Sequence, residues 1–429
     1  MDQIRQIKHD NQTFFVFICL TSMRLLIILE RFIPIFIIFF NGGLLNNATG
    51  QTNQDSVNLP KHNSKDFLEI LGLEKNKTYH QDSTNSKDLG PFFSVVPVVG
   101  YAMATGITAA LINNISFYTE SSLEKLSSIQ TSLFYSQHHQ YWAIINSNIF
   151  LKKIKANLVG DWRLYRFPTK TFGLGSESEL NLPDIIDYYY IKFHQLLQHE
   201  FFPNVFLGVG YHLDDYWKIK DFASPSDKTD FQVYGFTKRS RSSGVSLDFL
   251  FDDRTNSINP DKGNYLSIQY RVNKTFLGSN NNWQSIILDA RKYFKFPANT
   301  DNVLAFWSYN CFTFNGKPPY LDLPSTGWDS YNNTGRGYTQ GRFRGRNLVY
   351  LESEYRFAIT QNGLIGGVVF LNEESASEWV SNEYGKVQPG YGAGFRIKLN
   401  KHSRVNLAID YGFGTKGSRG LSFCLGELF

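Results

Sequence analysis

The sequence has few cysteines, no marked charge imbalance and no long uninterrupted apolar run. Three cysteines in 429 residues, Cys19, Cys311 and Cys424, exclude a disulfide framework and imply no redox or zinc chemistry. Forty-three basic residues against 38 acidic ones give a formal net charge of +5, spread along the chain. Nucleic-acid binders carry clustered positive charge, so we expect no nucleic-acid partner.

Aromatic residues and glycine are abundant instead. The chain holds 37 Phe, 24 Tyr, 7 Trp and 34 Gly beside only 14 Pro. This enrichment suits strands that meet an apolar or interfacial environment. A hydrophobic fraction of 42% excludes a disordered chain. The composition therefore favours β structure over helices.

The N-terminal segment has the pattern of a secretion signal. Arg24, Glu30 and Arg31 interrupt its apolar runs, so none reaches the ~18 residues of a spanning helix. Reading from Met23, a charged leader, a short apolar segment and a small-residue region predict a signal peptide within residues 1–50, with a mis-start before Met23. A signal anchor left in place is the alternative. Residues 51–90 form a polar periplasmic tether, too short for a domain of their own.

From residue 91 to residue 429 apolar and polar residues alternate with a period of two. The segments 245–252, 266–273, 395–400 and 405–414 show the alternation best. We predict about sixteen strands. Their approximate spans are 94–104, 105–118, 129–139, 140–152, 153–167, 184–200, 202–217, 242–254, 262–276, 281–295, 301–314, 347–358, 363–373, 390–399, 403–412 and 419–429.

Two all-β architectures produce such alternation. A soluble sandwich turns its apolar face inward, whereas a membrane barrel turns it outward to lipid. The secretion signal, the aromatic excess and the terminal Phe429 favour the barrel. The fold class we predict is all-β, a transmembrane antiparallel β-barrel of about sixteen strands at residues 91–429, with both termini in the periplasm.

The connection before residue 347 is long and carries the most informative motif, Gly335-Arg336-Gly337-Tyr338 followed by Gly341-Arg342-Phe343-Arg344-Gly345-Arg346. Glycines spaced among aromatics and arginines indicate a folded loop. This stretch resembles the Arg-Gly-Phe/Tyr loop of the BamA/TamA outer-membrane assembly superfamily, also called the bacterial surface antigen family.

Three other segments agree with the resemblance, in the family's order. Pro97 to Gly106 is similar to the family's first hairpin. Asp253 and Arg254, followed by Pro260 and Gly263, resemble its periplasmic turn, in which proline and glycine set the dihedrals. The C-terminal segment resembles its closing strand; Phe423, Leu425 and Phe429 are its apolar positions, and Gly426 reduces side-chain packing there.

The resemblance implies that the long outer loop folds into the lumen and that Arg336 pairs with the barrel wall. The wall motif of the family is Phe-x-Asp, and here it reads Phe370-Leu371-Asn372. A buried guanidinium needs carboxylates to offset its desolvation, and the candidates are Glu352, Glu354 and Asp410, with Glu373 ranked last because it faces lipid or the rim. We expect Asn372→Asp to be neutral or stabilising.

Other polar residues receive no functional role. Arg342, Arg344 and Arg346 are interpreted as solvated loop charges. His138 and His139 point to opposite sides of a strand, so we expect no metal site. No catalytic triad or phosphate loop occurs. We therefore expect no enzymatic activity and no cofactor.

Two functions remain open. The resemblance implies an outer-membrane protein of assembly or transport whose partners are membrane lipid and unfolded barrel clients, which add to an edge at the seam between the first and last strands. The chain would be a barrel-only member, without the periplasmic POTRA domains of the assembly proteins. The alternative is a structural barrel, a barrel with a dedicated periplasmic or lipoprotein partner, or a narrow pore.

Overall fold

The structure is a computed structural model that describes residues 91–102, 106–119, 125–137, 139–166, 168–179, 183–223 and 229–429. These residues belong to the second of two compact units, Leu59–Phe429. The expected signal peptide and the polar tether lie outside the described residues.

One antiparallel sheet of seventeen strands forms the described unit. The strands are β1 (Phe92–Ala102), β2 (Gly106–Phe117), β3 (Ser127–Ser136), β4 (Tyr141–Leu151), β5 (Ala156–Arg166), β6 (Thr169–Thr171), β7 (Asp184–Phe202), β8 (Val205–Asp221), β9 (Arg239–Asp252), β10 (Gly263–Asn273), β11 (Trp283–Lys295), β12 (Val303–Gly316), β13 (Asn347–Ala358), β14 (Ile365–Ala376), β15 (Gln388–Asn400), β16 (Val405–Phe413) and β17 (Arg419–Leu425). Both β5 and the three-residue β6 pair with β7, so the strands take sixteen positions.

Helices are few and short. The described residues contain α3 (Asp230–Gly235) and the 3-10 turns η2 (Lys152–Ile154), η3 (Thr275–Leu277), η4 (Tyr320–Asp322) and η5 (Thr415–Gly417). None of these helices is long and apolar enough to cross a membrane.

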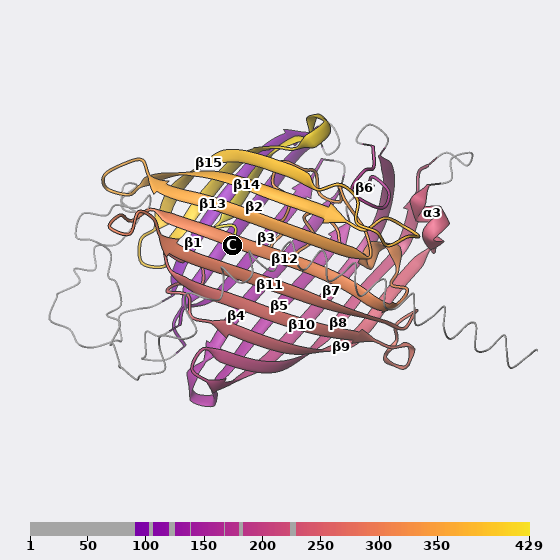
Figure 1. Cartoon of the computed structure of the whole chain (residues 1–429), viewed down its shortest axis with the longest axis horizontal. Coiled ribbons are helices and arrows are strands. Elements are labelled where there is room, and N and C mark those ends of the chain that lie inside the picture. The colour runs from indigo at the N-terminus through magenta and orange to yellow at the C-terminus, as the bar shows by residue number, and fades with distance from the viewer. Residues whose placement is uncertain are drawn as a thin grey trace, which may run out of the picture. The chain divides into compact units, whose positions relative to one another are not determined.

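The sheet curls round into a barrel (Figure 1). Among the described residues, consecutive strands pair with each other, except that β5 pairs with β7 and not with β6, and no pairing register joins β1 to β17. Side chains meet here instead: Val96 of β1 and Ile112 of β2 pack against a buried cluster formed by Leu399 of β15, Val405 of β16 and Leu425 of β17. The sheet is therefore not closed by backbone hydrogen bonds, and its first two strands contact its last three through side chains.

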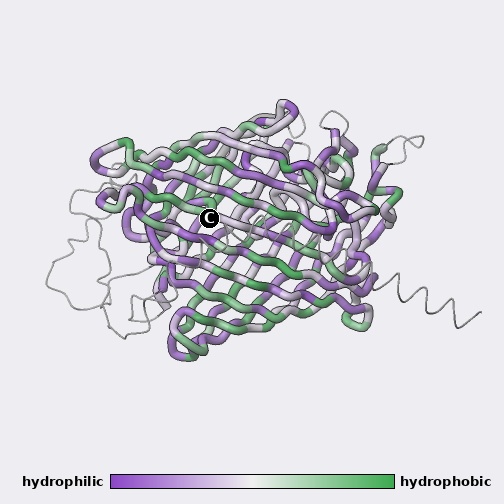
Figure 2. The backbone as a smooth tube through the Cα atoms, in the orientation of Figure 1, coloured by the Kyte–Doolittle hydropathy of each residue, from purple (hydrophilic) through white to green (hydrophobic). Residues whose placement is uncertain are grey.

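The two faces of the sheet differ as expected for a membrane barrel. Hydropathy alternates along the strands in Figure 2. Outward-facing Leu247 and Phe395 are 61% and 59% exposed, whereas inward-facing Asp248 and Arg396 are both 4% exposed. A soluble sandwich requires the reverse, so the predicted barrel is confirmed and the sandwich is excluded.

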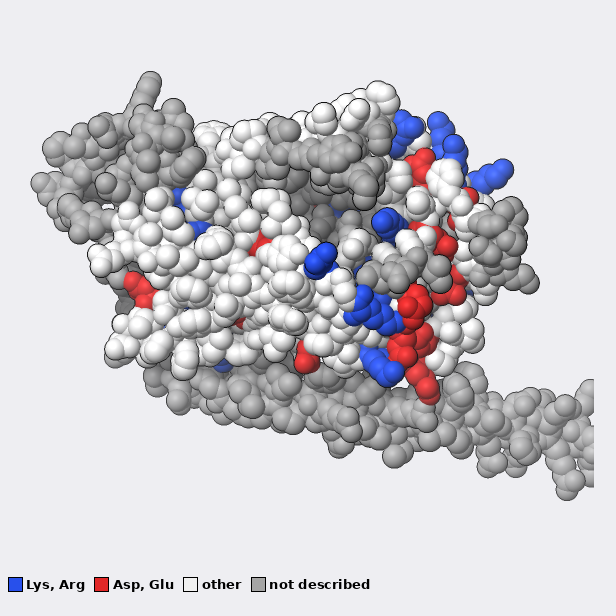
Figure 3. All heavy atoms as spheres, turned by 90° about the horizontal axis from the view of Figure 1, so that it is seen from above, with Lys and Arg blue, Asp and Glu red and all other residues white. Residues whose placement is uncertain are grey.

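Connection length separates the two ends of the barrel. The connections between β5 and β7, β8 and β9, β12 and β13, and β14 and β15 are long and lie at what we call the loop end. The connections at the opposite end, the turn end, include the short ones between β7 and β8, β13 and β14, and β15 and β16. In the view of Figure 3 charged side chains gather at the loop end, while the side wall is largely uncharged. This is the distribution expected of a wall that contacts lipid.

One strand ends earlier than predicted. We expected the last strand to reach residue 429, but β17 ends at Leu425. Gly426 has φ of 101°, a left-handed conformation that turns the chain out of the sheet. Continued alternation would have pointed Glu427 at lipid; the turn places its side chain in the lumen instead, where it is 1% exposed.

Candidate functional site in the barrel lumen

The connection between β12 and β13 folds back into the barrel and presents Arg336 to the wall. Gly335 and Gly337, on either side of Arg336, have φ of 78° and 95°. Residues with a Cβ are strained in this region, so the two glycines permit the bend that turns the guanidinium inward. The backbone of the loop is held to itself by the hydrogen bond from Thr326 N to Phe343 O, 3.0 Å.

Three carboxylates surround the Arg336 guanidinium. Its Nη2 pairs with Glu352 and Glu354 of β13, and its Nη1 lies 2.9 Å from Asp410 Oδ2 of β16. All four side chains are at most 2% exposed. Glu373, the candidate ranked last, is exposed on the other face of β14. The carboxylates named from alternation are thus the ones the structure brings to Arg336.

Phe370 and Asn372 of the wall motif also contact Arg336. The guanidinium carbon lies 3.6 Å from the centre of the Phe370 ring, a cation–π contact. Asn372 Nδ2 donates to the backbone oxygen of Arg336 at 3.0 Å. A carboxylate at position 372 has no proton to donate to that oxygen. Because this contact requires a donor, the structure argues against the expectation that Asn372→Asp is neutral or stabilising.

Glycines on the inward face of β15 and β16 make room for the loop. A Cβ on Gly412 would lie 2.6 Å from Gly337 N, and a Cβ on Gly390 would lie 2.9 Å from Arg336 O. Both distances are shorter than real Cβ contacts, so the backbone of the loop rests directly on the strands. The sequence analysis did not predict this contact between the loop and the strands, although glycines at alternate positions of adjacent strands indicate such a close approach.

Tyr338 anchors the loop to the loop-end edge of β15 and to the connection after β16. Its hydroxyl donates to Pro389 O at 2.6 Å and accepts from Thr415 N at 3.0 Å. Its ring packs edge to face on Phe343, with ring centres 5.0 Å apart. Arg336 and Tyr338 therefore fasten one end of the loop to β13, β15 and β16.

The ionic cluster extends from the loop to residues 427–429. Arg396 joins Asp410 and Glu427, with Nε 2.7 Å from Glu427 Oε2. Arg356 joins Glu354 and donates to Phe429 O at 3.0 Å. The cluster as a whole contains three arginines and four carboxylates, namely Arg336, Arg356, Arg396, Glu352, Glu354, Asp410 and Glu427. It links the loop, three strands and the last residues in one buried network.

Phe429 lies inside the lumen and not on a closing strand. Its ring stacks on Trp307, with ring centres 5.2 Å apart, and contacts Tyr293. Of the residues assigned to the closing strand, only Phe423 and Leu425 belong to β17: Phe423 faces outward at 45% exposure and Leu425 packs with Leu399 and Val405. Gly426 and Phe429 turn inward, which corrects their assignment.

The arginines that follow Tyr338 are buried, contrary to their interpretation as solvated charges. Arg342 is 1% exposed and donates to Ser178 O at 2.7 Å. Arg344, also 1% exposed, donates to Tyr320 O at 3.0 Å. Arg346 donates to Thr313 O and Gly316 O and is partly buried. The fold of the loop thus gives all three guanidinium groups backbone carbonyls as partners.

The turn motif lies between β9 and β10, at the turn end of the barrel. Arg254 pairs with Asp252, Nε to Oδ1 2.9 Å, and lies over the Tyr265 ring. Asp253 accepts from the backbone of Asn264, Pro260 is buried, and Gly263 has φ of 112°. The carboxylate that neutralises Arg254 is therefore Asp252, which sequence analysis did not name. The turn also reaches residue 427, through Glu427 N to Ile258 O.

The loop crosses the lumen to the wall opposite Arg336. Arg163 of β5 donates to the backbone oxygens of Asp329 and Ser330 at 2.8 and 2.7 Å. Asn333 of the loop donates to Leu428 O at 2.7 Å. The loop and residues 427–429 thus obstruct the lumen together.

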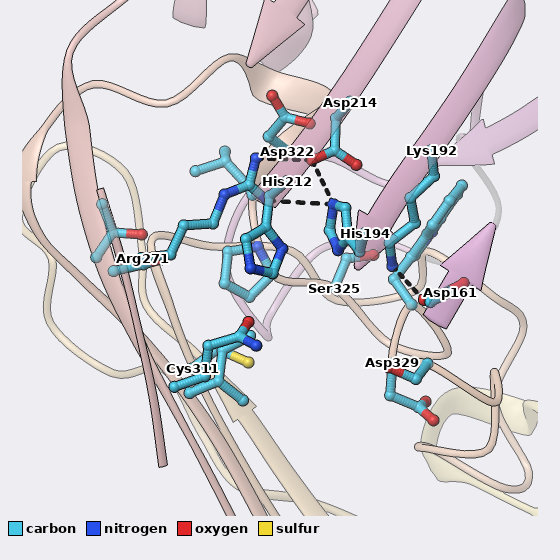
Figure 4. A pocket seen from close by; sticks show the side chains of 18 of the residues that line it. Asp161, Lys192, His194, His212, Asp214, Arg271, Cys311, Asp322, Ser325 and Asp329 are labelled. Atoms are coloured by element: carbon cyan, nitrogen blue, oxygen red, sulfur yellow. Dashed lines mark hydrogen bonds and ion pairs between the residues drawn. The ribbon is translucent and has the colours of Figure 1, made fainter. Parts of the chain in front are cut away.

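Polar cavities remain beside the obstruction. One, of about 190 Å³, is lined by side chains of β7, β8 and β10 (Figure 4). In it Asp214 pairs with His194 at 2.9 Å and with Arg271 at 2.8 Å, and Lys192 pairs with Asp161 at 2.6 Å. A second, of about 170 Å³, adjoins residues 424–429. Small spaces lined partly by paired charged groups fit a hydrated lumen.

Comparison with solved structures supports the fold. CdiB from Escherichia coli matches with a TM-score of 0.50 at 11% identity, covering 77% of this chain and 61% of that chain. CdiB from Acinetobacter baumannii (TM-score 0.48, 15% identity, 79% and 60% covered) and BamA from Haemophilus ducreyi lacking POTRA domains 1–3 (0.48, 14%, 77% and 68%) also match. The chain spans about three fifths of the length of the CdiB structures. No family model and no curated protein matches the sequence.

Proposed function

We propose that the protein is an outer-membrane β-barrel that assists the assembly or transport of other proteins at the seam between β1 and β17. The outward apolar wall supports placement in a bilayer, and the predicted secretion signal supports the outer membrane. The loop end faces outward and the turn end faces the periplasm, following the usual lengths of outer and inner connections in such barrels.

The single observation that carries the proposal is the missing ladder at the seam. Among the described residues β1 pairs only with β2 and β17 only with β16. Unpaired strand edges accept an added strand through backbone hydrogen bonds, without regard to its sequence. Side chains that pack across a seam separate at lower cost than a continuous ladder, so this is the place where the barrel opens to a client strand.

The obstructed lumen supports the same route. The loop bridges opposite walls through Arg336 and Arg163, and Phe429 fills the space beside Trp307. Passage through the barrel axis requires the buried ionic cluster to break, which costs several kcal/mol. The lateral seam therefore offers the cheaper path for a protein segment.

The proposal is tested by cross-linking the seam. Phe92 of β1 and His402 of the β15–β16 turn stack across it, with ring centres 5.7 Å apart. In a background with Cys311 and Cys424 replaced by serine, cysteines at positions 92 and 402 are joined by a short bifunctional thiol reagent in membranes. We expect folding of newly made client barrels to fall several-fold after cross-linking and to recover when a cleavable reagent is reduced.

A matched control is a cysteine pair at Leu371 and Tyr391, which face lipid at paired positions of β14 and β15. Cross-linking this pair joins strands that are already hydrogen-bonded, so client folding is expected to be unchanged. Equal client folding with the seam free and joined would overturn the proposal.

A partner-bound role is the second candidate, and one observation favours it. Large apolar side chains are exposed on the connections of the loop end: Phe222 at 62%, Phe276 at 82% and Val380 at 71%. Side chains of this kind beyond the lipid-facing wall mark surfaces that bind other proteins. Recovery of one stoichiometric partner by cross-linking in intact cells, lost when these three residues become serine, would favour this role.

A further inference from the structure

A row of aromatic and basic side chains crosses the outer face of five adjacent strands at the loop end. The pairing register places Tyr141 of β4 opposite Arg166, Arg166 opposite Tyr189 and Tyr189 opposite Trp217, and Trp217 opposite Arg239 of β9. Side chains at directly paired positions lie about 5 Å apart on one face of a sheet, so the row is continuous.

Basic side chains lie over the Tyr189 ring of this row. The Arg166 guanidinium carbon lies 5.4 Å from the centre of the Tyr189 ring, and Lys218 Nζ lies 5.1 Å from the same centre. Tyr189 stacks on Trp217, with ring centres 5.6 Å apart. Two positive groups are therefore held over one aromatic pair that faces away from the lumen.

Cations outnumber anions on this surface. Arg239 and Arg241 share a single carboxylate, Asp215, at 2.7 and 2.6 Å. Their side chains remain 58% and 39% exposed, whereas Asp215 is 12% exposed. With Arg166 and Lys218 they make four cations around Asp215, the patch that we call the basic rim; the next row toward the loop end places Asp187 opposite Lys220.

Toward the turn end, the same face becomes apolar within two rows. In the first row Leu164 and Ile191, exposed at 40% and 39%, continue into Asp215 and Arg241, and the second row holds Trp162 stacked on Phe193. The cations therefore stand at the boundary where the lipid-facing wall meets water, the level of lipid headgroups, where aromatic rings also gather. An anion that neutralises them must lie beside the hydrocarbon layer.

We propose that the basic rim binds the phosphate groups of a phosphorylated glycolipid of the outer leaflet, while the acyl chains lie along the apolar rows below. Guanidinium groups bind phosphate through paired hydrogen bonds, and a phosphate monoester carries about 1.5 to 2 negative charges at neutral pH. The continuity of the cations with the apolar wall selects a lipid over a soluble phosphate. The inference depends on the barrel lying in a bilayer with its loop end outward, and not on its role with client proteins.

The test measures binding of lipid A, a diphosphorylated and acylated glucosamine disaccharide, to the full chain purified in detergent and stripped of lipid. The variant is Arg166→Gln with Lys218→Gln, which leaves the ion pairs of Asp215 intact. Each basic group near an anionic lipid surface contributes roughly fivefold in affinity, so we expect about 25-fold weaker binding. The control, Lys155→Gln with Lys262→Gln, removes two exposed lysines at the turn end and should bind as the wild type does.

Folding of every variant is checked first by the heat-dependent shift of the barrel on electrophoresis. Tyr189→Leu is a second variant, which removes the aromatic ring beneath the two cations without changing the charge. Wild-type protein should bind dephosphorylated lipid A as weakly as the double variant binds lipid A. Equal binding by wild type and double variant would overturn the inference. Displacement of lipid A by inorganic phosphate at equal concentration, or equal binding of phosphatidylglycerol, would overturn the assignment to a glycolipid. None of these results depends on client folding, so failure here is separable from failure at the seam.

Discussion

Replacement of Arg336 by alanine tests the lumen cluster most sharply. The substitution leaves Glu352, Glu354 and Asp410 buried without the cation that they share. Removing one partner of a buried ion pair costs about 3–5 kcal/mol, and loss of the contact with Phe370 adds about 1 kcal/mol. Water entering from the lumen offsets part of this, so we expect a net loss of about 4 kcal/mol in the free energy of unfolding, roughly a thousandfold in the equilibrium constant.

The assay is urea unfolding of the refolded barrel in detergent, followed by tryptophan fluorescence and by the electrophoretic shift. Arg419→Ala is the matched control, because Arg419 is exposed at the start of β17. Arg344 is unsuitable as a control because it is buried. Arg336→Lys should lose an intermediate amount, since an ammonium group cannot present the planar fork that reaches Glu354 and Asp410 together.

A double-mutant cycle separates the pair from general damage. Glu352→Gln removes a carboxylate that the Arg336→Ala variant leaves uncompensated, so the double variant should be more stable than Arg336→Ala alone. The reasoning would be refuted if Arg336→Ala unfolded within about 0.5 kcal/mol of Arg419→Ala, or if the two changes were additive.

Three further substitutions probe the seat of the loop and the last residues, each measured by the same unfolding assay. Asn372→Asp should lose about 1–3 kcal/mol at neutral pH and less as the pH falls, because only a protonated carboxyl donates to Arg336 O; a pH-independent loss would contradict this. Gly412→Ala should lose about 1–3 kcal/mol because its Cβ meets Gly337 N, whereas Gly420→Ala, with nothing within 4 Å, should be neutral; equal losses would be inconsistent with a seated loop. Gly426→Ala should lose about 1–2 kcal/mol because φ is 101°, and an unchanged stability would argue for an extended end of β17.

The strands could be predicted from the sequence because successive residues face lipid and lumen in turn, and lipid favours apolar side chains whereas the lumen favours polar ones. Segments such as 245–252 and 405–414 alternate, and β9 and β16 cover most of both. Glycine and proline in the turn at 260–263 marked a boundary in the same way. Alternation also placed Glu352, Glu354 and Asp410 on the polar face. These carboxylates were therefore the main candidate partners for a buried arginine.

Burial inside the loop could not be predicted in this way. A segment without periodicity does not reveal whether its arginines meet water or carbonyl groups, and Arg342 and Arg344 were misjudged for that reason. The same limit applies to the end of β17, where alternation continues through residue 429 but one glycine and the attraction between Glu427 and Arg396 turn the chain inward. The pairing of Arg254 with Asp252 was equally out of reach, because adjacent aspartates cannot be distinguished by type.

The function that we propose predicts that other membrane barrels depend on this one. The most direct measurement is quantitative proteomics of the outer membrane after the protein is depleted in its native host, with the seam-linked variant and the Leu371–Tyr391 control supplied in turn. Our account predicts a broad fall in other barrels that the control restores and the seam-linked variant does not. An unchanged outer-membrane profile, or loss of one protein only, would contradict it.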